Sequence, residues 1–147
     1  LRGKWLRGRG NIYYVDCYNA NPASMLDAIR FFQCEAGDLP KLLTLGGMEE
    51  LGSEGPRLHQ EIGSRINIGP SDKVLLVGQK AQWMKAGILQ SGIEEESIQS
   101  VEDALEAESL VNEFEGAVLL KGSRVNALET LVPDWASEEG KMEYAEC

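Results

Sequence analysis

The sequence predicts an α/β fold: a three-layer sandwich in which a mostly parallel sheet of about six strands carries helices on both faces. Short apolar runs without polar alternation are expected for strands that are buried on both sides. Such runs occur at residues 12–15, 41–45, 73–77 and 116–120. A helical pattern follows each run, which is the arrangement that produces a covered parallel sheet of the Rossmann-like kind.

The first part of the chain contains a strand at 12–16 and a helix at 22–35. Residues 1–10 are basic and glycine-rich, and we interpret them as a short strand or loop that leads into the strand. Asn21 is a suitable N-cap, and Pro22 suits the first helical position because it lacks an N–H that would be unpaired there. The apolar face of this helix is formed by Met25, Ala28, Ile29, Phe32 and Ala36.

The middle of the chain repeats the order of strand and helix twice. A buried strand at 41–45 ends in two glycines and precedes a helix at 54–66. A turn at 69–72 leads into a third buried strand at 73–77, and a short helix is predicted at 81–86. The apolar face of the longer helix is formed by Leu58, Ile62 and Ile66.

The last third of the chain is predicted to add two strands and two helices. A short strand is expected at 98–101, and Ser100 is a candidate cap for a helix over about 101–112. The last buried strand covers 116–120. A final helix is predicted to carry Val125, Leu128, Leu131 and Val132.

Length and composition are those of one globular domain. The chain has 147 residues, of which 43% are hydrophobic and 26% charged, and it is long enough to bury a core. Residues 1–133 are predicted to form this domain. Residues 134–147 are acidic and poor in apolar side chains, so we expect a disordered tail. The chain starts at Leu1 and not at Met, which looks like a cut inside a longer protein.

Charge and cysteine content argue against several classes of protein. A formal net charge of −10 is unfavourable for a nucleic-acid surface. No apolar run is long enough to span a membrane, and no signal peptide opens the chain. The cysteines are odd in number and lack C-x-x-C spacing, which predicts no metal site and a reducing, cytoplasmic compartment.

The stretch at 15–25 is the strongest candidate for a binding site. It joins a strand to a capped helix start, where free N–H groups and the positive end of the helix dipole suit a phosphate or a carboxylate. On spacing alone, Asp16 can bind ribose hydroxyls or fix the loop. Asn19 and Asn21 can bind a ligand or act as turn and cap residues. Tyr18 can stack on a base or be half-buried.

Four motifs in this chain resemble, in order, those of the MurF-type Mur ligases. Residues 16–25 (DCYNANPASM) resemble D-x-Y-N-A-N-P-x-S-M, and residues 45–52 (LGGMEELG) resemble L-G-D-M-x-E-L-G. His59 and Gly63 match H-x-x-x-G, and residues 121–124 match K-G-S-R. Together they cover about residues 2–132. The family usually has Asp at the position of Gly47, so the task of that Asp would fall to Glu49, Glu50 or backbone groups.

This resemblance implies the C-terminal domain of an ATP-dependent amide ligase. The family reaction adds D-alanyl-D-alanine to UDP-N-acetylmuramoyl-tripeptide during synthesis of peptidoglycan precursors in bacteria. The domain would contribute nucleotide and dipeptide contacts when it closes over the central domain. It would be a monomer. It would also be inactive alone, because its sequence has no G-x-x-x-x-G-K-S/T loop. That loop and most of the Mg²⁺ site would belong to the central domain, and a further N-terminal domain would precede it.

The resemblance also assigns site residues, none of them catalytic or metal-binding. The ATP contacts would be Arg2, Asp16, Tyr18, Asn19, Asn21 and His59. The D-Ala-D-Ala contacts would be Lys121, Ser123 and Arg124. Arg7 and Arg9 are alternatives to Arg2 as the arginine that faces the phosphates. A helix-surface histidine without a catalytic role is the alternative for His59, and a solvated turn is the alternative for 121–124.

Two other classes of function remain open. One is a related amide ligase of the folylpolyglutamate-synthetase-like or cyanophycin-synthetase-like kind, against which the intact stretch at 18–22 argues. The other is a non-catalytic Rossmann-like binding module, for which Gly47 and the missing domains are the only support. The sequence upstream of Leu1 would distinguish these classes from the MurF-type ligase.

Overall fold

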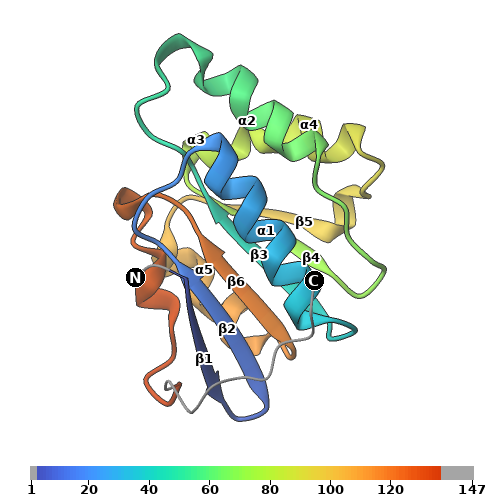
Figure 1. The fold of residues 1–147 in the computed structure, drawn as a ribbon, viewed down its shortest axis with the longest axis vertical. Coiled ribbons are helices and arrows are strands. Elements are labelled where there is room, and N and C mark those ends of the chain that lie inside the picture. The colour runs from blue at the N-terminus through green and yellow to red at the C-terminus, as the bar shows by residue number, and fades with distance from the viewer. Residues whose placement is uncertain (1–2, 137–147) are drawn as a thin grey trace.

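A computed structural model describes residues 3–136, and within them the chain forms one six-stranded sheet (Figure 1). The strand order is β1-β2-β6-β3-β4-β5. β1 and β2 form an antiparallel hairpin, and every other neighbouring pair is parallel. The predicted mostly parallel sheet is therefore confirmed. The strands are β1 (Lys4–Gly8), β2 (Asn11–Asp16), β3 (Lys41–Gly46), β4 (Lys73–Val77), β5 (Ile98–Val101) and β6 (Ala117–Lys121).

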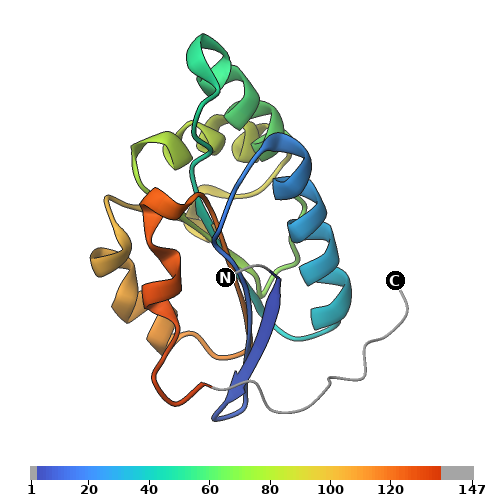
Figure 2. The same ribbon diagram turned by 60° about the vertical axis from the view of Figure 1, so that its left-hand side comes forward.

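Helices cover both faces of this sheet, as the sequence predicted (Figure 2). One face is covered by α1 (Pro22–Ala36), α2 (Gly55–Ser64), α3 (Gln79–Gln82) and α4 (Met84–Gln90). The other face is covered by α5 (Ala104–Glu113) and the 3-10 turn η4 (Leu128–Leu131). The remaining 3-10 turns are η1 (Gly52–Glu54), η2 (Glu95–Ser97) and η3 (Arg124–Asn126). None of the helices described here is long and apolar enough to cross a lipid bilayer.

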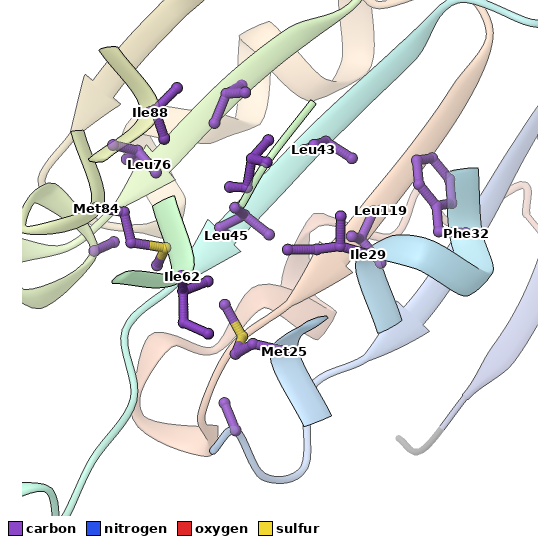
Figure 3. Packing of buried hydrophobic residues seen from close by; sticks show 14 of the residues in the cluster. Met25, Ile29, Phe32, Leu43, Leu45, Ile62, Leu76, Met84, Ile88 and Leu119 are labelled. Atoms are coloured by element: carbon purple, nitrogen blue, oxygen red, sulfur yellow. The ribbon is translucent and has the colours of Figure 1, made fainter. Parts of the chain in front are cut away.

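Two apolar layers hold these elements together. Successive side chains of a strand point to opposite faces, so β3 sends Leu43 and Leu45 to one layer and Leu42 to the other. Burying an aliphatic side chain of this size stabilises the fold by about 1.5–3 kcal/mol. Figure 3 shows the layer under α1, α2 and α4, which contains Met25, Ile29, Phe32, Leu43, Leu45, Ile62, Leu76, Met84, Ile88 and Leu119.

The start of α1 is fixed by Asn21, the predicted N-cap, in a reciprocal cap with Ser24. The Asn21 side chain accepts a hydrogen bond from the Ser24 N–H at 2.9 Å, and the Ser24 hydroxyl accepts one from the Asn21 N–H at 3.0 Å. Pro22 occupies the first helical position. Because the cap fixes this helix start directly after β2, it also fixes the loop that contains Asp16.

Four predictions about helices are corrected by the structure. Ser100 pairs within β5 and does not cap α5; the side chain of Asp103 accepts the Glu106 N–H at 2.9 Å instead. The predicted final helix is two short 3-10 turns, because Ala127 adopts a left-handed φ of 50° between them. The short helix predicted at 81–86 is the pair α3 and α4, and the helix predicted at 54–66 ends at Ser64.

The carboxyl end of the described chain packs onto the sheet. Trp135 lies edge-on to Tyr13 with ring centroids 5.8 Å apart, and the guanidinium of Arg9 lies 5.1 Å from the Trp135 ring. Regular packing therefore continues past Pro133, where the domain was predicted to end. The rest of the predicted tail, residues 137–147, lies outside the described residues, as does Arg2.

Candidate functional site

The carboxyl ends of β2, β6, β3 and β4 lie next to one another in that order. The loops that follow them therefore share one edge of the sheet, which is where ligands bind in open α/β folds. This edge contains the Asp16 loop after β2, the loop after β3, and the Lys121–Arg124 loop after β6. Its geometry defines two pockets.

The first pocket, which we call the Asp16 pocket, lies between the loop after β2 and the end of β6. It has a volume of about 390 Å³. It brings together five of the residues that the sequence proposed for a site. Its lining consists of Gly3, Asp16, Tyr18, Asn19, Asn21, Ser24 and Lys121.

Lys121 belongs to this pocket as a buried cation. It lies opposite Asp16 in the parallel pairing of β2 and β6, and its side chain is only 1% exposed. Its Nζ donates to Asp16 Oδ2 at 3.0 Å and to the carbonyl of Asn19 at 2.8 Å. The dipeptide contact of Lys121 stays a prediction; in this structure β2 and β6 are neighbours, and the lysine is bonded to the Asp16 loop.

Arg124 also turns toward this loop. Its guanidinium lies 5.3 Å from the ring centre of Tyr18, within the range of a cation–π contact. Tyr18 is 41% exposed, so the aromatic face is partly open to a ligand. Two residues that were predicted to serve the dipeptide thus contact residues that were predicted to serve the nucleotide.

The position of Gly3 bears on the predicted phosphate-facing arginine. Gly3 lines the Asp16 pocket, because the antiparallel hairpin carries the chain start toward the carboxyl end of β2. Arg7 pairs with Ile12 at the opposite end of β2, and Arg9 lies on Trp135. Neither of these alternatives to Arg2 is placed beside Asp16. Arg2 itself is not described and stays a prediction.

The second pocket, which we call the Lys80 pocket, lies between the loop after β3, the start of α3 and the loop after β6. It has a volume of about 240 Å³. Lys80 and Glu49 form an ion pair across it, and Ser123 donates from its hydroxyl to Asn126 Oδ1 at 3.0 Å. Its lining consists of Gly47, Glu49, Gln79, Lys80, Ser123 and Asn126.

Gly47 determines where the Lys80 side chain can lie. A Cβ added at Gly47 would come within 2.6 Å of the Lys80 Cβ, which is closer than such atoms approach in proteins. The Asp that the resembling family has here would therefore force Lys80 and the start of α3 to move. In this chain the stem of Lys80 occupies that space, and Glu49 supplies a carboxylate nearby.

His59 lies inside the protein and not at the surface of either pocket. Its side chain is fully buried; Nε2 accepts the Met48 N–H at 2.9 Å, and Nδ1 lies 2.6 Å from the carbonyl of Gly55. The acceptor role of Nε2 assigns the proton to Nδ1. The helix-surface alternative is contradicted, because the ring is buried and holds the loop after β3. The ATP contact of His59 stays a prediction. Burial lowers the pKa of His59 from its ordinary value of 6.5.

Three residues of the edge were missed by sequence reasoning: Gln79, Lys80 and Asn126. Lys80 follows the end of β4, so its position after a buried strand could have identified it. Asn126 gave no such signal. Its side chain packs against Gly46 and Gly122, where a Cβ would overlap it, so only the folded ends of β3 and β6 reveal its place.

A larger cavity than either of these pockets lies elsewhere on the described surface. It measures about 930 Å³ and lies at the amino ends of β2 and β6, beside Asn11, Gly116 and Trp135. We place the site at the carboxyl edge because the topology and the sequence motifs both point there. Within residues 3–136, no group of three or more His, Cys, Asp or Glu side chains is placed to hold a metal ion.

Comparisons with known proteins identify the family of this domain. Residues 2–124 match the family model described as "Mur ligase, glutamate ligase domain". A UDP-N-acetylmuramoyl-tripeptide–D-alanyl-D-alanine ligase from Rickettsia prowazekii (strain Madrid E) is 30% identical over 131 residues, which are 89% of this chain and 29% of that protein. The chain thus spans less than a third of the length of this relative.

Solved structures give the same result. A crystal structure of MurF from Acinetobacter baumannii superposes with a TM-score of 0.72 at 27% identity, covering 88% of this chain and 29% of that one. MurF ligase from Thermotoga maritima in complex with ADP superposes with a TM-score of 0.64 at 25% identity, covering 86% of this chain and 28% of that one. The chain therefore belongs to the Mur ligase family, as a glutamate ligase domain homologous to the C-terminal domain of MurF.

Proposed function

We propose that this chain is the C-terminal domain of an ATP-dependent ligase that joins D-alanyl-D-alanine to UDP-N-acetylmuramoyl-tripeptide. The relative from Rickettsia prowazekii carries that activity in its name, and one structural neighbour was solved with ADP. The observation that carries the proposal is the joint edge of β2, β6, β3 and β4. There the Asp16 pocket and the Lys80 pocket adjoin through the Lys121–Arg124 loop.

The reaction would proceed through an acyl phosphate. ATP transfers its γ-phosphoryl group to the terminal carboxylate of the tripeptide and leaves as ADP. The dipeptide amine attacks the acyl carbon, loses a proton, and expels phosphate as the amide forms. Mg²⁺ would be held mainly by the central domain, where it would neutralise phosphate charge.

In this proposal the chain binds and orients, and the central domain supplies the phosphoryl-transfer machinery. Asp16, with its orientation fixed by Lys121, accepts hydrogen bonds from the ribose, and Tyr18 offers a partly exposed ring to the base. Arg2 would reach the phosphates with its planar fork. The loops approach the central domain only on closure, so the chain alone would be inactive.

The test is a ligase assay with the full-length enzyme that contains this domain. With ATP, UDP-N-acetylmuramoyl-tripeptide and D-Ala-D-Ala, we expect the amide product by mass spectrometry, with one ADP and one phosphate released for each amide. Omitting the dipeptide should abolish the product. Product formation from a different amine, with D-Ala-D-Ala unused, would refute the proposal.

A further inference from the structure

We propose that the Lys80 pocket binds the two charged ends of the dipeptide, with Lys80 on its carboxylate and Glu49 on its ammonium group. This inference rests on the proposed function and assigns the charged ends of the dipeptide to residues other than the two cations of the K-G-S-R motif. It starts from the two cations of that motif. Lys121 is buried against Asp16, and the guanidinium of Arg124 lies over the ring of Tyr18, so both contact residues that line the Asp16 pocket.

The Lys80 pocket lies next to the same motif on its other side. Ser123 lines it, and the Ser123 N–H donates to the carbonyl of Gly47 at 3.2 Å. This bond ties the loop after β6 to the loop after β3. A ligand in the Lys80 pocket would therefore lie beside the Asp16 pocket, as a nucleophile must lie beside the site of phosphoryl transfer.

The charge of the pocket matches a zwitterion. Its walls carry one cation and one anion, Lys80 and Glu49, whose side chains are 46% and 32% exposed. A polyphosphate would be repelled by Glu49, whereas a free dipeptide carries one charge of each sign. An exposed ion pair of this kind contributes only about 0–1 kcal/mol, so a ligand can separate Lys80 from Glu49 at little cost.

The size and the remaining groups of the pocket also suit a dipeptide. Its volume of about 240 Å³ lies below the range of roughly 300–1,000 Å³ that is typical for drug-sized ligands. Ser123 and Asn126 place a hydroxyl and an amide on the wall formed by the loop after β6. These groups can pair with the peptide group between the charged ends.

Gly47 makes this arrangement possible in this chain. Because Gly47 lacks a Cβ, the stem of Lys80 can lie against it and direct the ammonium toward Glu49. Gly47, which departs from the family motif, thus leaves room for Lys80. In this proposal Lys80 binds the carboxylate in place of Lys121.

The test compares two substrates in the full-length enzyme: D-Ala-D-Ala, and its C-terminal amide, which lacks the carboxylate. We expect the unaltered enzyme to prefer the acid by tenfold or more in kcat/KM, as one charged hydrogen bond allows. Lys80→Gln should lower kcat/KM for the acid by about tenfold while changing that for the amide, and the KM for ATP, by less than about twofold. Glu49→Gln should lower kcat/KM for both substrates and keep the preference for the acid.

The matched control is Lys85→Gln, because Lys85 pairs with Glu95 and lines neither pocket. It should behave as the unaltered enzyme. Retention of the acid preference in Lys80→Gln would overturn the inference while leaving the proposed function in place. An equal loss for both substrates would also overturn it, since that result indicates a structural role. If the unaltered enzyme does not ligate D-Ala-D-Ala at all, the proposed function fails, and this inference fails with it.

Discussion

At the scale of single residues, the two partners of the Asp16–Lys121 ion pair differ in their exposure to solvent. Lys121 is 1% exposed, whereas the Asp16 side chain is 21% exposed and can be solvated if its partner is removed. An unpaired charge in the interior costs about 3–5 kcal/mol. Removing the carboxylate should therefore damage the fold more than removing the ammonium group.

We predict that Asp16→Ala lowers the free energy of unfolding by about 3 kcal/mol or more, and Lys121→Met by about 1–2 kcal/mol. Methionine fills the space of the lysine stem without a charge. Urea unfolding of both variants, followed by circular dichroism, measures the difference. Equal losses, or a larger loss for Lys121→Met, would show that Lys121 is not buried as a charge.

His59 should make the stability of the fold depend on pH. Burial lowers its pKa in the folded protein below the ordinary value of 6.5, so the unfolded chain binds the proton more readily. The contribution to stability is therefore complete above the pKa of the unfolded state and is lost as the pH falls through the lowered pKa of the folded state. Protonated Nε2 can no longer accept the Met48 N–H, and Lys80 and Glu49 are the charged groups that act on the ring.

We expect the unaltered chain to lose more stability between pH 7 and pH 5 than the His59→Gln variant does. His59 is the only histidine in the sequence, so no other imidazole contributes. Unfolding curves in urea at several pH values give the comparison, and both proteins contain the same carboxylates. Parallel dependences on pH would mean that His59 does not titrate with folding.

At the scale of elements, α2 and α4 pack through two glycines. A Cβ at Gly63 would overlap the backbone of α4, and a Cβ at Gly87 would overlap the backbone carbonyl of Gln60 in α2. The helices can approach this closely only because both side chains are hydrogen atoms. This contact positions α2, whose His59 in turn holds the loop after β3.

Gly87→Ala should therefore destabilise the fold by about 2–3 kcal/mol, because the helices must separate to admit a methyl group. Gly69→Ala is the matched control: its Cβ would meet only Asp72 Oδ2, at an ordinary 3.4 Å, and its φ is not in the left-handed region. It should change stability by less than about 0.5 kcal/mol. Thermal unfolding of both variants tests the contact, and a Gly87→Ala protein as stable as the control would contradict it.

The elements show which features local sequence can predict. The strand at 73–77 and the cap at Asn21 were predicted correctly, because apolar runs and cap residues act within a few positions. The prediction of a helix after residue 124 was wrong. The spacing of its apolar residues suits a short 3-10 turn such as η4 as well as an α-helix. Only the left-handed backbone at Ala127 separates the two.

At the scale of the whole molecule, the site depends on a strand order that the sequence does not reveal. β6 is last in the chain but lies between β2 and β3. Its residues are apolar on both faces, so their pattern is the same at any inner position of the sheet. Lys121 was therefore assigned apart from Asp16, although the fold makes them partners. The sequence could therefore predict which residues lie at the carboxyl edge of the sheet, but not which of them contact one another.

The most direct test of this account is a split of kinetic constants in Asp16→Asn, measured in the full-length enzyme. The amide keeps the shape of the carboxylate and an acceptor for Lys121, so the variant should lose stability but stay folded, which circular dichroism checks. Losing the charged acceptor for the ribose should raise the KM for ATP by about tenfold, since a hydrogen bond of this type contributes about 1–3 kcal/mol. The KM for D-Ala-D-Ala should stay within about twofold of its original value. A rise in the KM for the dipeptide, with that for ATP unchanged, would contradict the assignment of the Asp16 pocket to the nucleotide.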